Sequence, residues 1–241
     1  MPDAPDYSKY LPNSIHYSLQ DLSELAARIG SVDVYDRRGE VVVIDDITHG
    51  LSGWGKSGTG LNWAANIVVD PVYHSPFALQ LIADAAPGSL TQVFKYYDQV
   101  IAAKTGLEIG ICFTVEFDYF QMYIVHDNLI RKQNAVLKID NTNKQISVMD
   151  DSLTFKVIDA ITPPVFAYGK FHDVKLVADF SSGYYMRLLY DEHQYDLSKY
   201  KLAVGGTPSD EHMETLFTLA SNGSNAGFAY MGHMIVTSNE P

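Results

Sequence analysis

The chain has 241 residues, of which 46% are hydrophobic, and carries a formal net charge of −12. This charge opposes contact with phosphate backbones and anionic lipid headgroups, so nucleic acids and membranes are not expected partners. A single cysteine, Cys112, excludes an intrachain disulfide and a zinc site built from several cysteines, and is consistent with a reducing compartment.

The first 36 residues are interpreted as an N-terminal extension, and residues 37–241 as one domain. Residues 1–14 are polar and lack the basic start and apolar run of a signal peptide, so a cytoplasmic protein is expected, or a secreted one if a leader has been trimmed. No window approaches the ~20 apolar residues of a membrane helix. Ser18 can cap one amphipathic helix, which Gly30 ends.

From residue 40 onward the pattern is one of strands separated by turns. Short strands with a turn every ten residues or so are typical of an antiparallel sandwich or barrel. The strands are expected at residues 40–47, 66–70, 77–83, 90–97, 109–125, 135–140, 145–149, 153–158, 171–180, 184–190, 214–220 and 228–237.

Residues 109–119 alternate strictly between apolar side chains and small or acidic ones. Because strand side chains alternate between two faces, the odd-numbered residues should face the core and the even-numbered ones a second surface. Glu116 and Asp118 would then be neighbours on that surface, with Cα atoms about 6.5–7 Å apart. Such a carboxylate pair suits general acid–base chemistry; a solvated polar face without a chemical role is the alternative.

Residues 50–57, with the sequence GLSGWGKS, match the phosphate-loop pattern G-x-x-x-x-G-K-[ST]. A phosphate loop must open directly into a helix, whereas more loop-forming residues follow Ser57 here. We therefore interpret the segment as a Gly-rich surface loop. Trp54 and Trp63 are candidate platforms for the apolar face of a sugar ring, and plugging the end of the sandwich is the alternative.

Two segments carry a resemblance to concanavalin A-like lectin and glucanase domains. Residues 44–47 lead into the Gly-rich loop with Trp54, and residues 171–176 are followed by a Ser-Ser-Gly turn and Tyr184-Tyr185. The resemblance covers about residues 40–237 and implies an all-β, two-sheet antiparallel jelly roll, here with a short N-terminal helix. It implies no cofactor other than a structural calcium ion, for which Asp45 or Asp46 would be a ligand; a turn at the strand end is the alternative role.

Residues 116–121, with the sequence EFDYFQ, resemble the Glu-x-Asp-x-x-Glu signature of laminarinase-type glucanases. That resemblance implies that Glu116 is the nucleophile and that Asp118 tunes it. Gln121 stands where the family has its acid/base glutamate, and an amide cannot donate and recover a proton at neutral pH. The family's mechanism is therefore not expected here.

We expect a protein that binds a carbohydrate or a similar polar ligand on its concave sheet without cleaving it. Arg187 is a candidate because alternation in residues 184–190 places it with Tyr185, opposite Met186 and Leu188. One alternative is a glycoside hydrolase or polysaccharide lyase that combines Glu116 and Asp118 with another carboxylate. A further alternative is an interaction domain, such as a homo-oligomer. The candidate ligand-binding residues are Glu116, Asp118, Gln121, Tyr185, Arg187, Trp54 and Trp63.

Overall fold

The computed structural model describes residues 38–73, 75–97, 103–114, 116–159, 169–207 and 211–241. Within these ranges the chain forms strands, turns and irregular segments, and contains no helix long and apolar enough to cross a membrane. The expected amphipathic helix and the rest of the extension, residues 1–36, lie outside the described residues.

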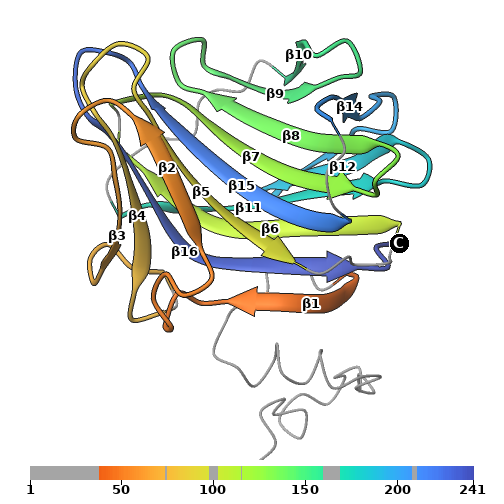
Figure 1. Ribbon diagram of the computed structural model, residues 1–241, viewed down its shortest axis with the longest axis horizontal. Coiled ribbons are helices and arrows are strands. Elements are labelled where there is room, and N and C mark those ends of the chain that lie inside the picture. The colour runs from red at the N-terminus through yellow and green to blue at the C-terminus, as the bar shows by residue number, and fades with distance from the viewer. Residues whose placement is uncertain (1–37, 74, 98–102, 115, 160–168, 208–210) are drawn as a thin grey trace, which may run out of the picture.

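Two antiparallel sheets, here named sheet A and sheet B, pack face to face (Figure 1). Sheet A contains β1 (Glu40–Asp45), β3 (Ala64–Val68), β4 (Ala78–Ala83), β6 (Lys104–Phe113), β11 (Phe171–Asp179), β12 (Tyr184–Tyr190), β13 (His193–Asp196) and β16 (Gly227–Ser238). Sheet B contains β2 (Gly55–Thr59), β5 (Leu90–Tyr97), β7 (Phe117–Asp127), β8 (Lys132–Asp140), β9 (Gln145–Met149), β10 (Phe155–Asp159), β14 (Ala203–Val204) and β15 (His212–Ser221).

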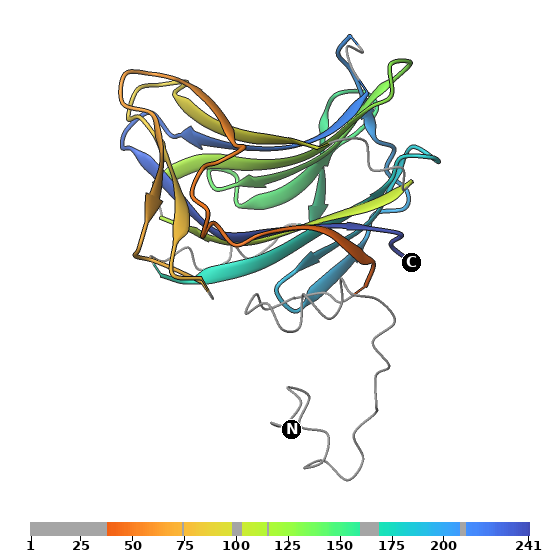
Figure 2. The same ribbon diagram turned by 60° about the horizontal axis from the view of Figure 1, so that its bottom comes forward.

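The strand order connects segments that are far apart in the sequence. Sheet A runs β13-β12-β11-β6-β16-β4-β3, with β1 also paired to β16; sheet B runs β10-β9-β8-β7-β15-β5-β2, with β14 beside β8. Figure 2 shows both sheets bending in the same sense, so that the outer face of sheet B is concave and that of sheet A is convex. The all-β, two-sheet architecture expected from the sequence is confirmed.

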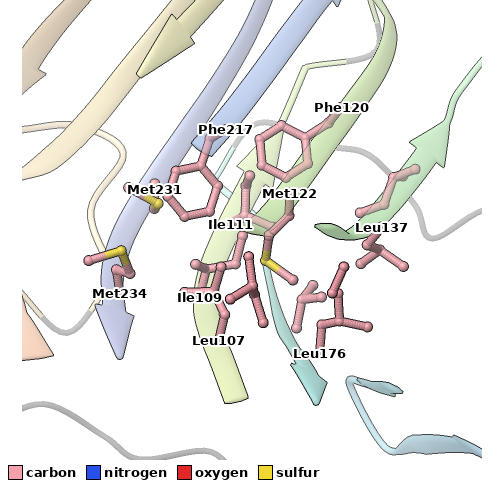
Figure 3. Packing of buried hydrophobic residues seen from close by; sticks show 14 of the residues in the cluster. Leu107, Ile109, Ile111, Phe120, Met122, Leu137, Leu176, Phe217, Met231 and Met234 are labelled. Carbon is pink, nitrogen blue, oxygen red and sulfur yellow. The ribbon is translucent and has the colours of Figure 1, made fainter. Parts of the chain in front are cut away.

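The core lies between the two sheets and consists of their inward side chains (Figure 3). Ile109 and Ile111 of β6 face Phe120 of β7 and Phe217 of β15, and all four are at most 1% exposed. Complete burial of an aliphatic or aromatic side chain of this size contributes about 1.5–3 kcal/mol to folding. These interlocking side chains fix which face of each strand remains available to a ligand.

The expectation of one strand over residues 109–125 was wrong. β6 ends at Phe113 in sheet A and β7 begins at Phe117 in sheet B, so the chain changes sheets between them. Phe113 and Phe117 are both buried, and their ring centroids lie 4.6 Å apart. The alternation of apolar residues in the sequence therefore continues although the chain passes from one sheet to the other. From Phe120 onward the even-numbered residues enter the core, and Tyr119 lies on the outer side.

Candidate functional site

The outer side of β6, where the sequence suggested a ligand surface, is covered by other parts of the protein. A Cβ atom on Gly110 would lie 2.6 Å from the ring of Tyr73, and one on Gly106 would lie 2.8 Å from a carboxylate oxygen of Glu240. Glycine is required at both positions because these side chains approach the backbone so closely. Glu108, between the two glycines, is fully buried. This surface is therefore a packed layer outside the core.

Glu240 is the centre of a buried ionic network on this convex face. Its Oε1 lies 2.8 Å from Lys175 Nζ and accepts a hydrogen bond from Thr237 Oγ1 at 2.5 Å, while its Oε2 pairs with Arg187. The side chains of Glu240 and Lys175 are fully buried, and that of Arg187 is 9% exposed. The structure thus places Arg187 in a network that ties the end of the described chain to sheet A.

Tyr185 and Arg187 lie on opposite faces of β12, contrary to the expected alternation. Arg187 pairs with Val177 and Tyr185 with Ala178, so Met186 is the extra residue of a β-bulge. The bulge turns Tyr185 into the core, where its hydroxyl donates to Met149 O at 2.7 Å and accepts from Val136 N at 2.8 Å. Strict alternation assumes one residue per step along the strand. The extra residue of a bulge shifts this count, so that side chains beyond it point to the face opposite to the one that alternation predicts.

Glu116 and Asp118 accept hydrogen bonds from two different loops. Glu116, in the connection between the sheets, accepts a hydrogen bond from Asn225 Nδ2 at 2.6 Å. Asp118, near the start of β7, accepts one from Thr142 Oγ1 at 2.5 Å. Both side chains are partly exposed. Their observed contacts are those of carboxylates that fix loop ends.

Trp54 fills the interior of the sandwich. It is 9% exposed, its ring lies 6.1 Å from that of Phe217, and its Nε1 donates to Asp45 Oδ2 at 2.9 Å. Lys95 Nζ lies 2.6 Å from the same oxygen. Trp54 is therefore a core residue with a polar anchor.

Asp45 and Asp46 make the contacts of a strand-end turn. Asp45 Oδ1 accepts the amide hydrogen of Ile47, and Asp46 Oδ1 accepts from both the amide and the hydroxyl of Thr48. In the part of the chain that the structure describes, no group of three or more His, Cys, Asp or Glu residues is arranged to hold a metal ion.

The phosphate-like sequence does not lead into a helix. Its last residues, from Gly55 to Ser57, belong to β2, which pairs with β5. The interpretation against a phosphate loop is therefore confirmed. Trp63 packs so closely against this strand that a Cβ atom on Gly58 would clash with its ring.

A row of polar side chains crosses the concave outer face of sheet B. Cross-strand pairing places Gln92 of β5 beside Thr218 of β15, and Thr218 beside Gln121 of β7. Ser57 of β2 and Lys138 of β8 extend the row at its two ends. We name the five residues Ser57, Gln92, Thr218, Gln121 and Lys138 the polar row.

Hydrogen bonds orient the amides of the polar row. Gln92 Oε1 accepts from Ser57 Oγ at 3.2 Å, and Gln92 Nε2 donates to Thr218 Oγ1 at 3.1 Å. Gln121 Oε1 accepts from the hydroxyl of Tyr123 at 2.7 Å. Amides and hydroxyls supply both donors and acceptors, which suits recognition of a ligand rich in hydroxyl groups.

A second row, two residues further along the same strands, is apolar. Leu216 of β15 pairs with Phe94 of β5 on one side and with Tyr123 of β7 on the other. All three side chains are partly exposed. We name these three residues the apolar row; it lies about 6.5–7 Å from the polar row along the strands.

Charged groups flank the two rows. Lys138 Nζ forms an ion pair with Asp140 at 2.7 Å and lies 4.7 Å from the centre of the Tyr119 ring. Burial opposes the ionised form of Asp140, but hydrogen bonds from Lys138 and Asn143 outweigh it and hold its pKa below the ordinary value. The positive charge at this end of the polar row is therefore matched by a negative one.

Glu214 lies on β15 at the other side of the apolar row, opposite Tyr96. Burial raises the pKa of Glu214, although the positive charges of Lys132 and His212 oppose that shift. The surroundings of this carboxyl group therefore make its ionisation unfavourable.

Replacing Glu214 with glutamine is expected to raise the melting temperature at pH 7. A raised native pKa means that ionisation destabilises the native state once pH exceeds the ordinary value of 4.5. The difference in melting temperature between Glu214→Gln and wild type should therefore disappear near pH 3, where the carboxyl group is protonated in both the native and the unfolded state. Thermal unfolding at both pH values measures it, with exposed Glu192→Gln as the control. A wild type more stable than the variant at pH 7 would contradict the burial argument.

Two curved antiparallel sheets with a concave outer face define a concanavalin-like jelly roll. No family model matches the chain, and no curated protein matches it. An endo-β-1,4-glucuronan lyase from the fungus Trichoderma reesei superposes with a TM-score of 0.56 and 13% identity, over 83% of this chain and 96% of that one.

Lectins and glucanases give similar matches. Lectin I-B4 from Griffonia simplicifolia has a TM-score of 0.53 and 12% identity, over 80% of this chain and 95% of that one. A glycoside hydrolase family 16 endo-glucanase from Bacteroides ovatus has a TM-score of 0.51 and 12% identity, over 81% of this chain and 100% of that one. At these identities the likeness establishes the fold.

Of the candidate residues named from the sequence, Gln121 is the one that lies in the polar row. Trp54 and Tyr185 are in the core, and Arg187 is on the convex face. The other members of the two rows were missed. Alternation within residues 90–97 separates Gln92 and Phe94 from buried Thr91 and Val93, but it does not show which strands lie beside them.

Proposed function

We propose that the protein binds a carbohydrate on the concave outer face of sheet B. The observation that carries the proposal is the register of the two rows, with Gln92, Thr218 and Gln121 beside Phe94, Leu216 and Tyr123. A sugar ring has an apolar face and a hydroxyl-bearing edge. The apolar row offers contact to the former. Partly exposed Gln92, together with the 9% exposed Gln121, offers hydrogen bonds to the latter, whereas Thr218 is 2% exposed.

The proposed role is binding without cleavage. The laminarinase-type reaction requires a glutamate where Gln121 stands, and the amide oxygen of Gln121 accepts a hydrogen bond from Tyr123 at 2.7 Å. Glu116 and Asp118 are each bonded to a separate loop. These contacts support a surface that recognises a sugar and leaves its glycosidic bonds intact.

Alanine at Gln92 or Gln121 is expected to weaken glycan binding about tenfold, which corresponds to about 1.4 kcal/mol and the loss of one good hydrogen bond. A glycan array first identifies a bound class, and calorimetry with that glycan, with and without calcium, then measures the affinities. Gln194→Ala is the matched control, because Gln194 lies on β13 of sheet A. Melting temperatures verify that each variant is folded.

Three results would contradict the proposal. Absence of binding to every polysaccharide class would remove the carbohydrate role. Equal affinities for wild type, Gln92→Ala and Gln121→Ala would move the site away from this face. Release of reducing ends or unsaturated sugars from a bound polysaccharide would replace the non-catalytic role with that of a hydrolase or lyase.

A further inference from the structure

Three neighbouring loops at one end of the sandwich expose large apolar side chains. They connect β7 to β8, connect β9 to β10, and follow β14, which lies beside the start of β8 at the right-hand end of Figure 1. Gly205 N donates to Lys132 O at 3.2 Å, and a Cβ atom on Gly205 would lie 3.7 Å from Leu153 Cδ2. We name the four exposed residues Leu129, Ile130, Leu153 and Val204 the end patch; they are between 37% and 88% exposed.

Two residues of the end patch have a backbone conformation that leucine rarely adopts. Leu129 has a φ of 65° and Leu153 a φ of 58°, both in the left-handed region, where glycine and asparagine are the usual residues. Neither side chain gains burial in return, since 57% of Leu129 and 56% of Leu153 is exposed. Backbone strain of this kind is typical of functional sites. The two leucines therefore destabilise the isolated chain, and burial against a partner would compensate for that cost.

Side-chain hydrogen bonds hold both leucine loops in place. Asn128 Oδ1 accepts the amide hydrogen of Arg131 at 2.8 Å. In the second loop, Asp150 Oδ1 accepts from the amides of Ser152 and Thr154 at 3.0 and 3.3 Å. The leucines are therefore presented in a fixed arrangement, and a partner that covers them would order little additional chain.

The charges around the end patch favour a second copy of the chain as the partner. Segments 127–132, 150–156 and 201–207 together carry four lysine or arginine residues and three aspartates, whereas the whole chain has a net charge of −12. Two copies repel each other through their acidic remainders, and this repulsion is weakest at the nearly neutral end patch. Its rim also carries both signs, such as Lys201 and Asp151, which are 3.7 Å apart and about half exposed. A rim of this kind is complementary to itself, as a two-fold contact requires.

We infer that the end patch is the contact between two copies of this chain in a two-fold symmetric dimer. This inference does not depend on the proposed carbohydrate role, because the end patch lies on the loops and the candidate site on the strands of sheet B. A dimer carries two concave faces. A polymeric ligand that reaches both faces would bind with avidity, without any new contact at either face.

Sedimentation equilibrium at protein concentrations from micromolar to millimolar tests the inference. Wild type is expected to pass from the mass of one chain to that of two. The double variant Leu129→Asn, Leu153→Asn should raise the dissociation constant of the dimer at least about tenfold, because each copy loses two apolar contacts. Its melting temperature in dilute solution should equal or exceed that of wild type, since asparagine tolerates the left-handed conformation. Leu61→Asn is the matched control: Leu61 is 94% exposed between β2 and β3, and its replacement should leave association unchanged.

Association of wild type is also expected to strengthen as salt is added, because salt screens the repulsion between two acidic chains. Four results would overturn the inference: the mass of one chain at every concentration, a dimer that the double variant leaves equally tight, a dimer that salt dissociates, or a lower melting temperature of the double variant. The last would show that the leucines stabilise the single chain. None of these results depends on glycan binding, so they leave the proposed function as it stands.

Discussion

Replacing Glu240 with alanine is expected to lower the free energy of unfolding by about 3–5 kcal/mol, the usual cost of removing one partner from a buried ion pair. Glu240 is the shared counter-charge of Lys175 and Arg187, and its carboxylate is fully buried. Without it, two cations remain in a layer that excludes water. The positive charge of Arg187 cannot be removed by deprotonation, because a guanidinium group stays protonated in proteins.

Denaturant unfolding of the variant measures this loss. Asp151→Ala is the control, since Asp151 pairs with Lys201 at 3.7 Å and both side chains are about half exposed. An exposed pair of this kind contributes about 0–1 kcal/mol. A Glu240→Ala effect as small as that of the control would show that the network is solvated in solution.

Replacing Gly110 with alanine is expected to cost about 1–3 kcal/mol, as is usual when a methyl group is forced into a packed site. The new Cβ would lie 2.6 Å from the Tyr73 ring and 2.9 Å from His233 Cε1, so Tyr73 would have to move. Its hydroxyl would then lose the hydrogen bond to Asp173 Oδ2, which measures 2.8 Å.

A double-mutant cycle with Tyr73→Ala isolates this contact. Most of the cost of Gly110→Ala should disappear once the Tyr73 ring is removed. Gly205→Ala is the matched control: the nearest atom to its Cβ is 3.7 Å away, so its effect should stay within about 0.5 kcal/mol. An undiminished cost of Gly110→Ala without the Tyr73 ring would contradict this close packing.

The fold could be predicted from the sequence because its signals are local. Alternating apolar residues and Gly, Asn or Ser turns indicate antiparallel strands without knowledge of their partners. The missed strands are polar or short: β2, with the sequence GKSGT, was interpreted as loop, and β13 and β14 have four and two residues. Local patterning also hid the change of sheet between Phe113 and Phe117.

The candidate site could not be predicted in the same way, because its residues come together only through the pairing of neighbouring strands. Gln92, Gln121 and Thr218 are separated by tens of residues and meet only through the pairing of β15 with both β5 and β7. Gly110 was expected on a ligand surface, but Gly106 and Gly110 are both closely packed positions. They make room for Glu240 and Tyr73, residues far from them in the sequence.

The most direct test of the proposed carbohydrate role of the concave face is to follow the side-chain amide resonances of the glutamines by NMR during titration with a β-1,4-linked gluco-oligosaccharide. The signals of Gln92 and Gln121 on sheet B are expected to shift until the ligand saturates the protein. The signals of Gln80 and Gln194 on sheet A are expected to stay in place. Shifts confined to Gln80 and Gln194 would contradict this role.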